Sequence, residues 1–261
     1  MIVLLLIFGG WIFAATMMWL VFLHQKRTGD AGIVDVAWAA GVGGLGTAFA
    51  FLADGNVARR WLIVAVVFIW AARLAIYIWR RVRSLPEDGR YQTMKAEWGV
   101  DASRRMFRFY QLQAIAVVLF AIPILIAAHN DQPLAWLDFA GVAIGAIGII
   151  GESIADLQLS RFRSVPGNKG QVCEVGLWGY SRHPNYFFEW LHWWAYVFLA
   201  ISYPWGWLTL MGPGLMWYFI TRVTGIPPTE AQAIKSRGDA YRRYQRTTNA
   251  FFPGPRRNLA T

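Results

Sequence analysis

Apolar stretches of about 20 residues recur along this chain, and they constrain its fold more than any other feature. A helix needs about 20 mostly apolar residues to cross roughly 30 Å of hydrocarbon. Inside lipid, backbone groups must be satisfied internally, which favours helices. The pattern therefore predicts an all-α integral membrane helical bundle forming a single domain over residues 1–261. Seven transmembrane helices are expected, near residues 2–23, 33–53, 61–79, 109–128, 134–158, 184–202 and 205–223.

The composition agrees with a membrane protein. Hydrophobic residues make up 56% of the chain, including 15 Trp and 17 Phe, which is more apolar surface than one soluble core can cover. The run Gly41, Gly43, Gly44 and Gly46 lies within one expected span and predicts close packing between helices. After the last span, Pro227 and Pro228 suit the first turn of a surface helix near residues 228–246.

The placement of the basic residues predicts an orientation. The net charge of +10 would suggest nucleic acid as a partner of a soluble protein, but here nearly all of the 25 Lys and Arg fall in loops on one side of the expected spans. Only Arg59 and Arg60 fall on the other side, and Arg73 lies within a span. Because basic loops stay in the cytosol, we expect the N-terminus outside and the C-terminus in the cytosol.

Several polar residues lie within the spans, in their cytosolic halves. Such residues are costly in lipid and usually mark a functional cavity. They therefore predict a water-accessible cavity that opens to the cytosol. The alternative is that Asp35 with Arg73, and Glu189 with His192, are buried pairs that lock helices together. The residues concerned are Asp35, Arg73, Tyr77, Glu152, Asp156, Asn185, Glu189 and His192.

Arginines are dense in the loops next to this expected cavity. Guanidinium groups bind phosphates in bidentate fashion, although they also bind anionic lipid headgroups. Histidine spacing indicates no metal site, and the sequence contains no Gly-rich dinucleotide loop, so any nucleotide has to be held by helices and loops. The arginines are Arg80, Arg81, Arg83 and Arg90 on one side, and Arg161, Arg163 and Arg182 on the other.

Three segments in the second half of the chain carry a resemblance to a known family. They are Arg-His-Pro-Asn-Tyr at 182–186, Gly-Asp-Ala-Tyr-Arg-Arg-Tyr at 238–244 and Phe-Phe-Pro at 251–253. Together they resemble the steroid 5-alpha-reductase superfamily, whose relatives include sterol reductases and isoprenylcysteine methyltransferases. The spacing of Asp156 and Arg163, and the motif Tyr77-x-x-Arg80, are similar to the 5-alpha-reductase branch.

The resemblance implies an enzyme that reduces the carbon-carbon double bond of a 3-oxo-4-ene steroid or a similar lipophilic enone. NADPH would bind from the cytosol and the substrate would enter from the bilayer. Tyr77 falls where the family holds the substrate ketone. The residues that fall at cofactor positions, or complete the shared motif, are Arg80, Arg90, Asp156, Arg163, Arg182, His183, Asn185, Tyr186 and Glu189.

The chain departs from the family on its second span, which lacks the Gln-Glu pair that supplies the acidic partner of the tyrosine. Asp35 is the acid in the inner half of that span, so we expect it to take this catalytic role. A carboxylic acid in an apolar site can donate a hydrogen bond to an oxygen on which charge develops.

Two other functions are compatible with the sequence. An S-adenosylmethionine-dependent methyltransferase would share the Arg-His-Pro-x-Tyr motif, but its ligand has no phosphate for the arginine-rich loops. A non-catalytic lipid-binding or transport protein would be expected to have a cavity open on both sides or an inverted repeat, and the sequence contains no repeat. The favoured location is a bacterial inner membrane, with the active site facing the cytosol.

Overall fold

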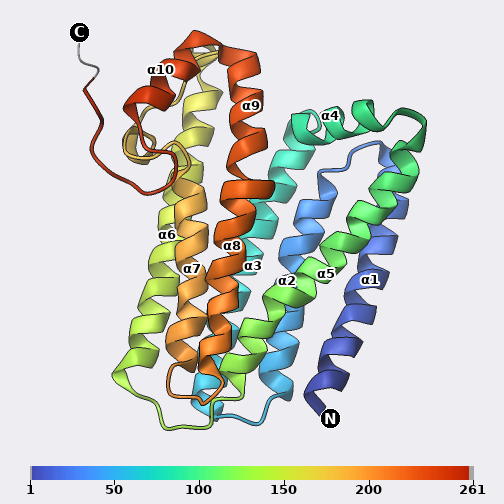
Figure 1. The fold of residues 1–261 in the computed structure, drawn as a ribbon, viewed down its shortest axis with the longest axis vertical. Coiled ribbons are helices and arrows are strands. Elements are labelled where there is room, and N and C mark those ends of the chain that lie inside the picture. Colours follow the sequence, from blue (N-terminus) through green and yellow to red (C-terminus); the bar gives the residue numbers. More distant parts are fainter. Residues whose placement is uncertain (1, 259–261) are drawn as a thin grey trace. The chain divides into compact units, whose positions relative to one another are not determined.

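The computed structural model describes residues 2–258, and within that range the regular structure is helical. Short 3-10 turns occur at Gly99–Asp101 (η1), Pro166–Asn168 (η2), Gly176–Gly179 (η3) and Gly206–Leu210 (η4), and a π-helical turn occurs at Phe219–Val223 (η5). The α-helices, labelled in Figure 1, are α1 (Ile2–Thr28), α2 (Ile33–Leu52), α3 (Val57–Ser84), α4 (Gly89–Trp98), α5 (Ala102–Ala128), α6 (Trp136–Ser164), α7 (Pro184–Ala200), α8 (Met211–Tyr218), α9 (Ile226–Arg237) and α10 (Asp239–Thr247).

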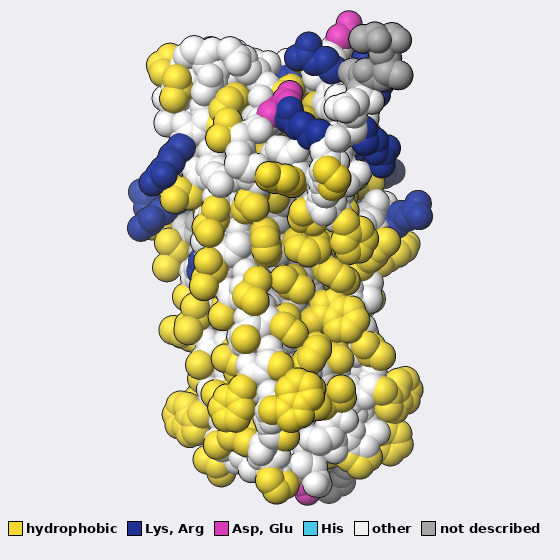
Figure 2. Space-filling model, turned by 90° about the vertical axis from the view of Figure 1, so that its left-hand side faces the viewer, with side chains coloured by type: hydrophobic (Ala, Val, Ile, Leu, Met, Phe, Trp, Pro, Cys, Tyr) yellow, Lys and Arg dark blue, Asp and Glu magenta, His cyan; other side chains and the backbone are white. Residues whose placement is uncertain are grey.

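Five helical segments within the described residues are long and apolar enough to cross a membrane. They are α1, α2, α3, α6 and the segment Gly89–Ala128 that contains α5. Figure 2 shows hydrophobic side chains over most of one face, with Lys and Arg gathered toward one end of it. Large apolar side chains exposed on helices this long need lipid as their solvent, so the chain is an integral membrane protein.

The last two expected spans have a different local structure from the others. The window 184–202 corresponds to α7, which has 17 residues. The window 205–223 is divided among η4, α8 and η5, so a 3-10 turn, an α-helix and a π-helical turn follow one another. These two spans therefore stay predictions.

The expected single surface helix at 228–246 is wrong in one respect, because two helices occupy this region. α9 ends at Arg237 and α10 begins at Asp239, and Gly238 between them has φ 56°. Residues with a Cβ rarely adopt this backbone conformation, so a glycine is required where the chain turns. Figure 1 shows the resulting corner between α9 and α10.

The chain divides into two compact units, one made of Met1–Phe139 with Tyr196–Leu210 and the other of Ala140–Ala195 with Met211–Thr261. In the first unit α2 packs on α3, and α5 packs on α1 and α2. A Cβ on Gly43 would lie 2.1 Å from Ala71 Cβ, and one on Gly46 would lie 2.7 Å from Ile124 Cδ1. The glycine run therefore packs helices closely as predicted, except at Gly44, where a Cβ would meet no other atom within 4 Å.

The connections at the start of α3 and α6 are held by one buried arginine. Arg59 is 0% exposed and donates to both carboxylate oxygens of Asp138, at 2.7 and 3.0 Å. Its remaining N–H groups donate to the backbone carbonyls of Asn130, Gln132 and Pro133. Every nitrogen of the guanidinium is thus hydrogen-bonded, which offsets the cost of burying its charge.

In the second unit α6 and α7 approach closely at two glycines. A Cβ on Gly148 would lie 2.8 Å from the backbone nitrogen of His192, and one on Gly151 would lie 2.3 Å from the ring of Phe188. The connection from α6 to α7 is anchored on α6, where Trp178 Nε1 donates to the Ala155 carbonyl at 2.9 Å. These contacts position the first turn of α7, where the predicted motif residues lie.

Candidate functional site

The predicted site residues are distributed over both units. Asp35, Tyr77, Arg80 and Arg90 belong to the first unit. The second unit contains Asp156, Arg163, Arg182, His183, Asn185, Tyr186 and Glu189.

Asp35, in the first turn of α2, binds two residues at the start of α4. Its Oδ2 accepts a hydrogen bond from Arg90 Nη2 at 3.1 Å, and its Oδ1 accepts one from the Tyr91 hydroxyl at 2.7 Å. The Asp35 side chain is 25% exposed. Its surroundings are therefore polar rather than apolar as expected, and its ion-pair partner is Arg90 rather than Arg73.

Arg90 is also held by Asp88, the N-cap of α4. Asp88 Oδ1 accepts from the backbone nitrogen of Arg90 at 3.0 Å, and the Asp88 carboxylate also binds the guanidinium groups of Arg90 and Arg81. Burial would raise the pKa of Asp88, but the charge and hydrogen bonds of Arg90, with the charge of Arg81, outweigh burial and lower it. The start of α4 is thus a network of ion pairs that connects α2, α3 and α4.

Tyr77 lies on α3, one turn beyond Arg73. The guanidinium of Arg73 lies 5.5 Å from the centre of the Tyr77 ring, a cation–π contact. The phenol is half-buried, whereas Arg80, one turn further along the same helix, is exposed. A cation on the ring face stabilises negative charge that develops at or near the Tyr77 hydroxyl.

In the second unit, Arg182 and His183 bind a glutamate that sequence reasoning did not select. Glu230 lies on α9, and its Oε1 accepts from Arg182 Nε at 2.6 Å and lies 3.2 Å from His183 Nε2. Its Oε2 accepts from Gln245 Nε2 of α10 at 2.7 Å. Arg182 also donates to the carbonyls of Gln245 and Thr248. We refer to Arg182, His183, Glu230 and Gln245 as the C-terminal lock.

The electrostatics of the C-terminal lock favour a charged acid and a neutral histidine. Burial would raise the pKa of Glu230, but hydrogen bonds from His183 and Arg182 outweigh burial and lower it to about 2. Burial lowers the pKa of His183, although the hydrogen bond to Glu230 opposes this. The acid is therefore ionised at neutral pH, and the arginine charge is neutralised within the lock.

Other residues of the motif support the same attachment. The rings of His183 and Tyr186 stack with centroids 5.3 Å apart, and the Tyr186 hydroxyl lies 3.3 Å from Thr229 Oγ1 on α9. Phe251 packs against the rings of Phe187 and Trp190 on α7. Arg182, His183 and Tyr186 of the first segment therefore contact α9, and Phe251 of the third contacts α7, so one role of these segments is to hold the C-terminal segment on α7.

A second polar group in this unit lies on the facing sides of α6 and α7. Asp156 is 3% exposed and accepts from Asn185 Nδ2 at 3.3 Å. Glu189, one turn after Asn185, is 7% exposed and accepts from Trp193 Nε1 at 3.1 Å. Glu152, one turn before Asp156, is also buried. We refer to Glu152, Asp156, Asn185 and Glu189 as the buried polar face.

Arg163 lies two turns beyond Asp156, in the last turn of α6, and it is exposed to solvent. The helix thus changes from buried carboxylates to exposed arginines over a short distance. Such an arrangement suits a ligand whose hydroxyl or amide groups bind the buried carboxylates and whose phosphates bind the exposed arginines. Among residues 2–258, no three His, Cys, Asp or Glu side chains form a group that could bind a metal ion.

The sequence contained only a weak signal for Glu230. It lies in the first turns of α9, two residues after Pro228, but nothing in the sequence indicates that its partner Arg182 lies 48 residues earlier. Tyr91, the second partner of Asp35, was also missed, and it is separated from Asp35 by 56 residues. Both contacts join segments that are distant in the chain, so local patterns do not reveal them.

Comparison with known proteins gives one match. A family model described as a protein of unknown function (DUF1295) matches residues 21–248. No curated protein matches the chain. No solved structure matches it either. The matched region runs from the end of α1 through α10 and includes both the buried polar face and the C-terminal lock. The chain therefore belongs to the DUF1295 family.

Proposed function

We propose that this protein is a membrane-bound reductase that uses NADPH to saturate the carbon-carbon double bond of a lipophilic enone, such as a 3-oxo-4-ene steroid. In this proposal α7 and the η4–α8–η5 segment complete seven spans, with the N-terminus outside and the C-terminus in the cytosol. The resemblance to the steroid 5-alpha-reductase superfamily motivates the reaction class. The favoured location is a bacterial inner membrane.

The buried polar face carries the proposal. Two buried carboxylates on one face of α6, opposite an amide and a third carboxylate on α7, are costly in helices that otherwise pack apolar side chains. A ribose or a carboxamide offers hydrogen-bond donors to such acceptors, and Arg163 at the exposed end of α6 suits a phosphate. These residue types therefore fit a nicotinamide dinucleotide, which when bound supplies the hydride.

Tyr77 is assigned to the substrate ketone. As the β carbon of the enone gains a hydride, the electron pair of the double bond moves toward the carbonyl and negative charge develops on its oxygen. A proton then adds to the α carbon and restores the ketone. A hydrogen bond from the Tyr77 hydroxyl, with the Arg73 charge 5.5 Å from its ring, would stabilise the developing charge.

The contacts of the other predicted residues suggest positioning roles. Asp35 binds Arg90 and Tyr91, so we assign it to holding Arg90 in place rather than to proton donation. Arg182 is held by Glu230 and two backbone carbonyls, which leaves it little capacity to bind a phosphate. We assign Arg182 and His183 to fixing the start of α7, and hence the position of Asn185.

Nucleotide binding is the first test. NADPH should raise the thermal stability of the detergent-purified protein, and Asn185→Ala and Arg163→Ala should each weaken this effect about 10-fold in apparent Kd, because one hydrogen bond to the nucleotide contributes about 1–1.5 kcal/mol. Arg161→Ala is the matched control, since Arg161 lies two residues before Arg163 in the same exposed helix end. Stabilisation by S-adenosylmethionine and not by NADPH would contradict the reductase proposal and favour a methyltransferase.

The second test separates chemistry from binding. Tyr77→Phe should retain NADPH binding but lose at least about 100-fold in the rate of enone-dependent NADPH oxidation, the scale of removing one donor from a developing oxyanion. Tyr218→Phe is the control, because Tyr218 is 56% exposed. If no enone among steroid and other lipid ketones stimulates NADPH oxidation, a lipid-binding protein without catalysis becomes the better description.

A further inference from the structure

One face of α5 changes from basic to apolar along its length. Six of its residues recur at alternating spacings of three and four, which places them on a single face of the helix. The two arginines near the N-terminal end are exposed to solvent. The residues are Arg105, Arg108, Leu112, Ile115, Leu119 and Ile122.

The basic end of this face lines a pocket of about 320 Å³. Trp98 and Phe109 contribute aromatic walls, Arg105 and Arg108 contribute the charge, and Leu112 forms the apolar end. Among residues 2–258, neither arginine has a carboxylate or another hydrogen-bond partner. Two adjacent guanidinium groups without an internal counter-charge attract an anion, and an aromatic residue beside them is typical of the membrane interface.

The charge around this pocket is reinforced by the neighbouring helix end. The Phe22 and Phe107 rings are in contact, with centroids 5.4 Å apart, so the C-terminal end of α1 lies beside the N-terminal end of α5. Lys26 and Arg27 occupy that end of α1 and are exposed. The basic residues of both helices therefore gather at one membrane interface.

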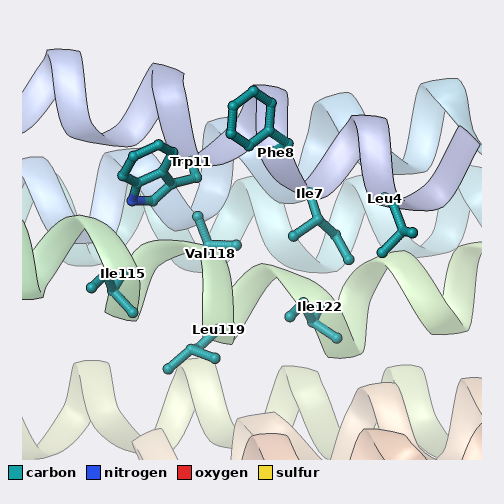
Figure 3. A pocket seen from close by; sticks show the side chains of 8 residues that line it. All are labelled: Leu4, Ile7, Phe8, Trp11, Ile115, Val118, Leu119 and Ile122. Carbon is teal, nitrogen blue, oxygen red and sulfur yellow. The ribbon is translucent and has the colours of Figure 1, made fainter.

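The apolar end of the same face lines a groove of about 330 Å³ between α1 and α5, drawn in Figure 3. The α5 side consists of Ile115, Val118, Leu119 and Ile122, and all of the lining side chains are apolar except for the Trp11 indole nitrogen. Phe8 and Trp11 of α1 form part of the opposite wall and are 57% and 43% exposed. A groove of this kind on a membrane-spanning helix is filled by an acyl chain.

The distance between the arginine pocket and the far end of the groove matches the length of one acyl chain. From Leu112 to Ile122 the helix rises about 15 Å at about 1.5 Å per residue, which is half of the roughly 30 Å hydrocarbon core. One leaflet's acyl chain therefore reaches from the arginine pocket to the far end of the groove. We propose that α1 and α5 bind an anionic phospholipid, with its phosphate on Arg105 and Arg108 and one acyl chain in the groove. This site contains none of the residues assigned to the reductase reaction and is independent of that proposal.

Lipid-selective binding tests the proposal. Phosphatidylglycerol and phosphatidylcholine with identical acyl chains are titrated into the detergent-purified protein, and bound lipid is counted by native mass spectrometry. Because each basic residue near an anionic headgroup contributes about 1 kcal/mol, two arginines should give phosphatidylglycerol about 30-fold tighter binding. Equal binding of the two lipids would overturn the proposal. Stabilisation by inorganic phosphate equal to that by phosphatidylglycerol would also overturn it, since the ligand would then be a free phosphate.

The double variant Arg105→Gln with Arg108→Gln should remove the preference for phosphatidylglycerol. Both arginines are exposed and lack partners among the described residues, so the substitutions should leave folding unchanged. The matched control is Arg242→Gln with Arg243→Gln on α10, which removes the same charge from another exposed basic pair. Loss of the preference in the control as well would show a general charge effect and overturn the assignment of the site to α5.

Discussion

Two arginines in this protein bind the same kinds of partner but differ in how deeply they are buried. Arg59 in the first unit and Arg182 in the second each bind a carboxylate and backbone carbonyls. The Arg59–Asp138 pair is 0% and 4% exposed, and its second carboxylate oxygen also accepts from the Ala135 backbone nitrogen. The Arg182–Glu230 pair is 10% and 14% exposed.

The difference lies in what else the carboxylate binds. Asp138 binds only Arg59 and its own helix start among the described residues, so it makes a closed connection. Glu230 also binds His183 and Gln245, and therefore joins the start of α7 with α9 and α10. An arginine buried in a closed pair stabilises one connection, whereas an acid shared with a histidine makes the attachment of a whole segment sensitive to pH.

Arg59→Ala should have the largest effect on stability. The substitution leaves Asp138 buried without its charge partner and three backbone carbonyls without a donor, so we expect a loss of about 3–5 kcal/mol. Thermal unfolding of the detergent-purified protein measures it. Arg60→Ala is the neighbouring control, since Arg60 binds the carbonyls of Ala50 and Phe51 and should cost about 1 kcal/mol. Equal losses would contradict the special role of the closed pair.

Glu230→Gln should have the next largest effect. Removing the charge leaves Arg182 and His183 without their acid, and we expect a loss of about 2–3 kcal/mol. Limited proteolysis should cut the segment after α8 faster, while the first unit keeps its resistance. Glu97→Gln, at an exposed position on α4, is the control and should change neither measurement. An unchanged cleavage rate would show that the lock does not hold the segment.

Gly238→Ala should destabilise the same attachment by a smaller amount. At φ 56° an alanine Cβ strains the backbone by about 1–2 kcal/mol, and the corner that brings Gln245 to Glu230 should distort. Gly214→Ala is the control, because its Cβ would meet no other atom within 4 Å and its φ is negative. A stabilised Gly238→Ala variant in thermal unfolding would contradict this account.

Mild acidification should lower the free energy of unfolding by less than any of the three substitutions above. His183 has a lowered pKa in the fold and the ordinary value of 6.5 when unfolded, so the unfolded chain binds more protons below that pH. The contribution of His183 to the free energy of unfolding is therefore fully present above pH 6.5 and decreases as the pH drops below that value. The pKa of Glu230 is 4.5 in the unfolded chain and about 2 in the fold, so its contribution to stability is lost as the pH falls from 4.5 toward about 2.

Thermal unfolding between pH 7.5 and 5.5 measures the contribution of His183. His183→Asn should flatten the profile in this window, whereas His24→Asn, at an exposed position near the end of α1, should retain the decrease. A profile that stays steep in His183→Asn would assign the pH dependence to another group.

Much of the fold follows from the apolar windows. The expected span 33–53 corresponds to α2, which ends at Leu52. The expected span 61–79 corresponds to the longer α3, since the apolar window marks the hydrocarbon core while the helix continues through Arg80, Arg81 and Arg83. The corner at Gly238 was missed because the helical spacing of side chains continues across it.

The sequence by itself determined that this protein lies in a membrane. It also selected Glu152, Asp156, Glu189 and His192 among the polar residues that its helices bury, but not Arg59 and Asp138. Apolar length and charge placement are local properties, and they follow from the free energy of transfer into lipid. Only the tertiary structure decided that Arg182 binds Glu230 and that Asp35 binds Arg90. Hydrogen bonds and ion pairs act over a few ångströms between residues 48 and 55 positions apart, so their partners depend on how the helices pack.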